Sequence, residues 1–226
     1  RGFVRRGLAG LLNVEKSDIR VERSLVGGHG DTSAGALIAP AIAALAAKLS
    51  ASPVRIGLRR ETGVKLTAKQ NPVSVIIRAF HDSSACIQSV ECAVHLDGGW
   101  QIDQAESVLR NILHHLDSAY FFPNIKVSGR ICKTNCLSST SSFSNGTGIA
   151  ALIVEEIISG VALHLKMNPK MVRERNFYAP GSDRAVTHYG QNVDGLRLRD
   201  AWERVTKLSS HEDRLREISE WNRTSS

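Results

Sequence analysis

The chain has 226 residues, of which 42% are hydrophobic and 23% are charged, a balance typical of a folded domain that excludes wholesale disorder. The most apolar run, residues 34–47, is short and contains Gly35 and Pro40, so we expect no segment that spans a membrane. The net charge is +7, but the 29 lysines and arginines are spread along the sequence, which favours a solvated surface over a nucleic-acid interface.

In chain order, the first 60 residues predict short helices and strands around a glycine-rich turn. Apolar spacing predicts a helix over 3–14, and alternation predicts a strand at 19–22. The turn at 27–31 leads into an alanine-rich helix ending near Leu49, which Pro40 either starts or kinks. A short buried strand is expected at 54–58.

The central part predicts three strands and two helices. Strands are expected at 73–80 and 86–96, joined by a turn at 81–84, and the glycines after Asp97 end the second. A helix over 104–116 and a strand over 125–134 follow. The clearest helix is 148–166, whose apolar side chains form one stripe opposite Glu155, Glu156 and Ser159.

After residue 168 the sequence becomes more polar. Asn168 and Pro169 are typical of a cap and a first helical turn, predicting a helix to about Arg175. A polar loop to Leu196 and helices near 198–207 and 211–221 complete the chain. We therefore predict an α/β (α+β) fold with mixed sheets and packed helices, in which residues 1–178 form the main body and 179–226 a helical connector.

Four cysteines are too few for a disulfide-rich secreted scaffold, and no signal-peptide pattern precedes the first helix. We expect a cytoplasmic chain, and the opening at Arg1 suggests a piece of a longer one. The cysteines do not have zinc-site spacing, so we predict no metal site and expect them to be buried as small hydrophobic residues. The adjacent pair His114 and His115 does not have metal-chelating spacing either.

Two glycine-containing loops open helices and are candidate binding sites. In residues 27–33, GGHGDTS, backbone N–H groups at a helix start suit a phosphate or another oxyanion, but glycine is equally required by an ordinary tight turn. The segment matches neither a Walker loop nor a dinucleotide fingerprint. Residues 141–148, SSFSNGTG, present the same choice between anion binding and a simple cap.

The run PNIKVSGRICKTN at 123–135 resembles the first molybdopterin-binding domain of the xanthine dehydrogenase and aldehyde oxidase family, the molybdenum hydroxylases. The segment VRERNFY at 172–178 is similar to the family's V-R-x-x-N-x-Y segment, and the likeness extends in order over nearly the whole chain. The resemblance implies an incomplete molybdopterin-binding domain. It also implies a complete protein that transfers a water-derived oxygen to a purine or aldehyde, with FAD and 2Fe-2S centres on other domains, as a homodimer.

The resemblance also assigns positions in the site, and most of them depart from the family's residues. On the cofactor side it places Gly28, His29, Gly30 and Ser144. On the substrate side it places Ser33 for a glutamate, Asn111 for a charge-stabilising arginine and Gly146 for a stacking phenylalanine; Arg110 is one position from Asn111.

Loss of such groups removes both charge stabilisation and substrate orientation, so we predict no catalytic residue and no turnover by this chain alone. The resemblance leaves two classes of function. The chain is either a fragment of a molybdenum hydroxylase-like oxidoreductase or a catalytically silent relative that serves as a structural or binding scaffold. Its expected partners are the remaining domains of a full-length chain and, if it is active, a purine or aldehyde substrate; we expect neither membrane nor nucleic acid as a partner.

Overall fold

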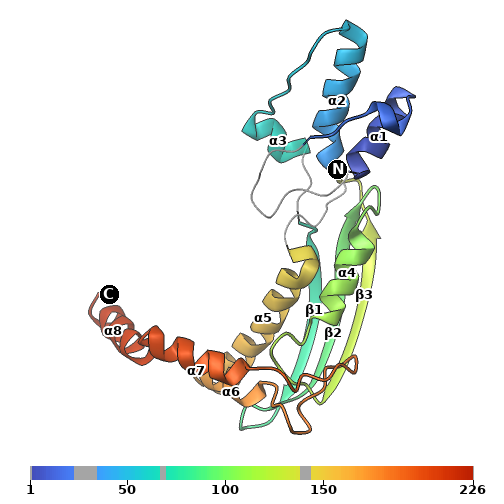
Figure 1. Ribbon diagram of the computed structural model, residues 1–226. Helices are drawn as coiled ribbons and strands as arrows, with labels where there is room; N and C mark the ends of the chain where they lie inside the picture. Colours follow the sequence, from blue (N-terminus) through green and yellow to red (C-terminus); the bar gives the residue numbers. More distant parts are fainter. Residues whose placement is uncertain (1, 23–34, 67–69, 138–143, 226) are drawn as a thin grey trace. The chain divides into compact units, whose positions relative to one another are not determined.

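The computed structural model describes residues 2–22, 35–66, 70–137 and 144–225 (Figure 1). In these ranges the main elements are, in order, α1 (Gly2–Leu12), α2 (Gly35–Ser50), α3 (Arg60–Leu66), β1 (Val73–His81), β2 (Ile87–Gly99), α4 (Ala105–His114), β3 (Asn124–Lys133), α5 (Thr147–Leu165), α6 (Pro169–Asn176), α7 (Leu198–Leu208) and α8 (His211–Thr224). Two short 3-10 helices, η1 (Lys16–Asp18) and η2 (Ser144–Gly146), complete the set.

The chain divides into two compact units that do not follow chain order. The first comprises residues 1–77, 91–116 and 126–154, and the second comprises residues 78–90, 117–125 and 155–226.

The three strands form one mixed sheet in the order β1-β2-β3. β1 and β2 are antiparallel, because Asp82 N donates to Cys86 O at the turn and Asp97 N donates to Pro72 O at the far end. β2 and β3 run in parallel, because Asn124 begins β3 beside Gln88 of β2 and Thr134 N donates to Gly99 O where both strands end. α4 is the crossover that a parallel pair requires.

Strict alternation along β2 places one row of side chains in the core, and Val90, Cys92, Val94 and Leu96 are all buried. The buried residues of α4 are Ala105, Val108, Leu109 and Ile112, of which Ala105 lies near Gly98 of β2 and Leu109 near Gly129 of β3. Its approach to β3 is close, because a Cβ atom built on Gly129 would lie 2.7 Å from Leu109 Cδ1. The mixed sheet with packed helices confirms the predicted fold class.

α5 carries the predicted apolar stripe. Its last residue, Leu165, is half-buried, and the others are buried: Ala150, Ile153, Val154, Ile157, Ile158, Val161 and Ala162. The expectation that no segment has the length to cross a membrane was wrong, because α5 is long and apolar enough to do so. In this structure 44% of its most apolar window is buried inside the protein. Its Glu155 also pairs with Arg173, an arrangement at odds with a lipid-facing segment.

Two predicted strands are absent from the described residues. Residues 19–22 and 54–58 have no strand partner there, and an alternating or apolar pattern forms a strand only when another strand supplies hydrogen bonds. Conversely, β2 continues past Asp97 to Gly99, because the end of β3 and Cys136 supply pairing partners for Gly99 and Trp100.

The C-terminal part follows the sequence prediction closely. Asn168 caps α6, and its Oδ1 accepts from Lys170 N at 2.9 Å, with Pro169 in the first turn. α7 and α8 contain no buried residue. This exposure is compatible with a connector, and the proposed boundary after residue 178 stays a prediction.

The cysteines are free, and only one is in the core. Cys92 is buried, and that burial raises the pKa of its thiol to about 11. Cys86 is half-buried, whereas Cys132 and Cys136 are exposed, so the expectation of uniformly buried cysteines was wrong. The reason is register: Cys132 lies on the outward row of edge strand β3, a property that composition does not reveal.

Candidate functional site

The structure describes part of the predicted site. Gly28, His29, Gly30 and Ser33 lie outside the described residues. Ser144 begins η2, and its backbone lies within the described part of the chain. The structure places the two remaining positions, Asn111 and Gly146, on opposite sides of one contact between α4 and η2 in the first unit.

The side chain of Asn111 holds the chain segment that leads into α5. It lies half-buried on α4, and its Nδ2 donates to the carbonyl oxygen of Asn145 at 2.9 Å. Asn145 has a left-handed conformation (φ 45°, ψ 44°), and its own Nδ2 donates to Ser107 Oγ at 3.2 Å. Asparagine is among the few non-glycine residues that adopt this conformation readily.

Gly146 follows with φ +94°, a backbone conformation that residues with a side chain rarely adopt. A Cβ atom built on it would lie 2.5 Å from Val108 O and 3.1 Å from Ile112 Cγ1. The backbone of Gly146 therefore packs directly on α4, at the position where the resemblance places a stacking aromatic ring. No side chain fits between this turn and the helix unless one of them moves.

Sequence reasoning missed Asn145 and Ser107 in this contact. The dipeptide Asn145-Gly146 carried the information, because Asn-Gly is a common pair where two successive residues need positive φ. Its position directly before a helix indicated a backbone turn rather than a ligand contact.

The described residues do not fit a substrate site that stabilises negative charge. The groups that meet here are amides and a hydroxyl, and Arg110 is exposed beside them. Asn145 Oδ1 is buried without a hydrogen-bond partner, but it is an acceptor, and a developing oxyanion requires donors. We therefore derive no catalytic step through these residues.

The other end of the connection between β3 and α5 is fixed by Asp97. Its Oδ1 accepts from Thr134 Oγ1 at 2.7 Å and from Gly99 N at 2.8 Å. Two backbone pairs continue this junction, Thr134 N to Gly99 O and Trp100 N to Cys136 O. Thr134 belongs to the C-K-T-N run that carried the resemblance, and its role here is to hold two strand ends together.

The segment at 172–178, which also resembles the family, makes contacts that hold the fold together. Arg173 forms an ion pair with Glu155 at 2.6 Å, and Tyr120 donates to the same carboxylate at 2.5 Å. Burial, together with this hydrogen bond, raises the pKa of Tyr120. Asn176 is fully enclosed: its Oδ1 accepts from Ile87 N, and its Nδ2 donates to the carbonyls of Ala85 and Val172, each at 2.8 Å.

Asp117 accepts two further hydrogen bonds in the second unit. Tyr178 Oη donates to its Oδ2 at 2.6 Å, and His188 Nδ1 lies 2.9 Å from the same oxygen, which places a proton on Nδ1. Burial and the bond to Asp117 raise the pKa of Tyr178. This network ties the polar loop after residue 179 to the segment at 117–125 within the second unit, and each polar group in it has a structural partner.

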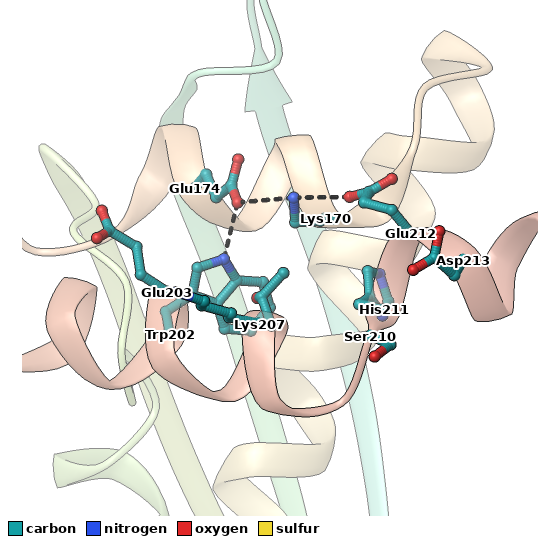
Figure 2. A pocket seen from close by; sticks show the side chains of 10 residues that line it. Lys170, Glu174, Trp202, Glu203, Lys207, Ser210, His211, Glu212 and Asp213 are labelled. Atoms are coloured by element: carbon teal, nitrogen blue, oxygen red, sulfur yellow. Dashed lines mark hydrogen bonds and ion pairs between the residues drawn. The ribbon is translucent and has the colours of Figure 1, made fainter.

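A hollow of about 400 Å³ lies between α6, α7 and α8. Figure 2 shows Lys170 between Glu174 and Glu212, at 3.5 and 3.0 Å, while the indole nitrogen of Trp202 donates to Glu174 at 2.7 Å. The hydrogen bond between Lys170 and Glu212 raises the pKa of the lysine and lowers that of the glutamate. At its centre one lysine is thus shared by two glutamates. Across the described residues, no group of three His, Cys, Asp or Glu side chains is arranged to hold a metal ion.

Comparison with known proteins places this geometry in a family. The sequence model of the molybdopterin cofactor-binding domain matches residues 2–177. Rat xanthine dehydrogenase/oxidase is 31% identical over 91% of this chain and 15% of its own length, and aldehyde oxidase 4 of Cavia porcellus is 32% identical over 98% and 16%. The chain thus spans about 15% of the length of these curated relatives.

Solved structures show the same fold at lower identity. Quinoline 2-oxidoreductase from Pseudomonas putida 86 aligns with a TM-score of 0.70 at 18% identity, over 95% of this chain and 29% of that one. CO dehydrogenase from Oligotropha carboxidovorans aligns with a TM-score of 0.75 at 16% identity, over 98% and 28%. The chain therefore belongs to the xanthine dehydrogenase and aldehyde oxidase family, as part of its molybdopterin cofactor-binding domain.

Proposed function

We propose that the chain is part of a molybdenum hydroxylase-like oxidoreductase whose complete form acts on purines or aldehydes, and that these 226 residues alone do not turn over substrate. The match to the molybdopterin cofactor-binding domain over residues 2–177 carries the first half of this proposal. The relatives named xanthine dehydrogenase and aldehyde oxidase supply the substrate classes.

The contact between α4 and η2 supports the second half. The amide of Asn111 is already bonded to the backbone, and a neutral amide stabilises developing negative charge far less than an arginine does. The aromatic ring that the resemblance expects at Gly146 has no room in this turn. Loss of a single charge-stabilising donor typically lowers a rate by about two to three orders of magnitude.

In the complete protein, bound molybdopterin would supply the metal that carries out oxygen transfer, and other domains would bear FAD and 2Fe-2S centres. A homodimer in the cytoplasm is part of the same proposal. The share of the relatives' length that the chain spans makes such additional domains plausible.

The test begins with expression in a host that makes the molybdenum cofactor. Molybdenum is measured by mass spectrometry, pterin by fluorescence after oxidation, and activity with xanthine and with an aromatic aldehyde. We expect no urate and no carboxylate from the 226-residue chain, and cofactor with turnover from any longer form. Substrate oxidation by the short chain would overturn the second half, and a longer form without molybdenum or pterin would overturn the first.

A catalytically silent scaffold is the second candidate. The observation that favours it is the same pair of internal contacts: groups at the substrate-side positions are used for packing the chain itself. A scaffold predicts a stable longer protein that purifies without molybdenum and oxidises neither substrate. An active hydroxylase predicts molybdenum in near-stoichiometric amount, so one metal analysis separates the two.

A further inference from the structure

The residues that join β3 to α5 begin and end at two side-chain networks. The segment leaves β3 at Lys133 and enters α5 at Thr147. The described residues at its two ends, 134–136 and 144–146, both contact residues of β2 or α4 in the first unit. The cofactor-side position Ser144 belongs to this segment.

We propose that both ends of this connection are positioned from within the chain, by Asp97 where it begins and by Asn111 where it ends. Asn111 is then a positioning residue that acts through Asn145, rather than a substrate contact. Any effect of this anchoring on cofactor binding rests on the proposed function, whereas the anchoring itself does not.

At the first anchor, one carboxylate oxygen organises two chain segments. Asp97 Oδ1 accepts from the hydroxyl of Thr134 and from Gly99 N, and Thr134 Oγ1 in turn accepts from Cys136 N at 3.3 Å. Asp97 is itself held, because Asn71 Nδ2 donates to its carbonyl at 2.7 Å and its N–H donates to Pro72 O. An ionised acceptor makes such hydrogen bonds stronger than neutral ones.

At the second anchor, α4 fixes a turn that has little freedom of its own. The hydrogen bond from Asn111 holds the carbonyl of Asn145, and the bond from Asn145 to Ser107 fixes its side chain. Two successive residues with positive φ then direct the chain onto the first turn of α5. The short amide of Asn111 reaches this carbonyl directly, so the asparagine by itself accounts for the second anchor.

Hydrogen exchange on the purified 226-residue chain, resolved by peptide or by nuclear magnetic resonance, tests each anchor separately. Asn111→Asp keeps the size of the side chain but turns its donor into an oxygen that faces the carbonyl of Asn145. We expect exchange near the start of α5 to become about tenfold faster, while residues 97–100 and 134–136 stay at the wild-type rate. Arg110→Ala, an exposed change one residue away, is the matched control.

Asp97→Ala should give the reverse pattern, about tenfold faster exchange at 97–100 and 134–136 with little change at α5. Asp97→Asn keeps the Oδ1 acceptor and should restore most of the protection, which would not happen if only the negative charge of the residue mattered. Ser107→Ala, on the exposed side of α4, is a milder variant of the second anchor if Asn111→Asp fails to fold, and it should loosen the start of α5 alone.

Unchanged exchange at α5 in both Asn111→Asp and Ser107→Ala would overturn the second anchor, and equal loss in Asp97→Asn and Asp97→Ala would overturn the first. Incubation with free molybdenum cofactor then distinguishes this inference from the proposed function. Intact anchors in a longer form that never retains cofactor would leave the anchoring standing and refute the function.

Discussion

Replacement of Gly146 by alanine tests the packing of the connection on α4. Position 146 has φ +94°, and a Cβ atom there would lie 2.5 Å from Val108 O, nearer than real Cβ atoms approach. A strained left-handed alanine costs about 1–3 kcal/mol, and overpacking against a fixed backbone costs about 1–3 kcal/mol more. The expected loss is therefore about 2–6 kcal/mol, a large part of the stability of an ordinary domain.

The assay is urea unfolding followed by circular dichroism, with Gly160→Ala as the control. Gly160 lies in α5, the helix that begins directly after Gly146, and a Cβ atom there would meet nothing within 4 Å. The control should gain about 0.5–1 kcal/mol, because alanine is the better helix former. If Gly146→Ala is as harmless as the control, the turn adapts and the argument against an aromatic ring at this position fails.

Further predictions concern the second unit. Asn176→Leu should lower the free energy of unfolding by about 3 kcal/mol, since three buried backbone groups lose their partner. In the same denaturation assay, a smaller loss of stability than the one caused by replacing an exposed asparagine with leucine would contradict this. Asp117→Ala should cost about 2–4 kcal/mol, and more than Tyr178→Phe, which removes only one of the two bonds to the carboxylate; calorimetry ranks the two variants. The hydrogen bond from Ser84 holds the pKa of Asp82 below its ordinary value, so its stabilising effect is present at neutral pH and disappears on acidification below about pH 4. Asp82→Asn should therefore lose less stability than wild type between neutral and acidic pH, and parallel pH curves would refute the assignment.

The same contacts predict what happens to the structure when the family's residues are restored at positions 111 and 146. A longer form with Asn111→Arg and Gly146→Phe would carry the residues that the resemblance implies at these two positions. The geometry predicts that these two changes first disrupt the contact between α4 and η2. They would require compensating changes at Val108 or Asn145 to be tolerated.

The sequence alone determined the elements whose signals are local. The apolar stripe of α5, the alternation of β1 and β2, and the Asn168-Pro169 start of α6 all appeared where periodicity and capping preferences placed them. The ordered resemblance over most of the chain also identified the family before any tertiary information. These features depend on neighbours a few residues apart, which is the range that a sequence pattern records.

The tertiary structure decided which residues are used for packing and which remain for chemistry. Asn111 meets Asn145 across 34 residues, and Asp117 meets Tyr178 across 61, distances along the chain over which no single-sequence pattern reports a contact. The same applies to the strands that did not form at 19–22 and 54–58, because a strand exists only with a partner. The sequence alone does not show whether a polar residue at one of the family's site positions faces a ligand or its own backbone. Only the folded chain distinguishes the two.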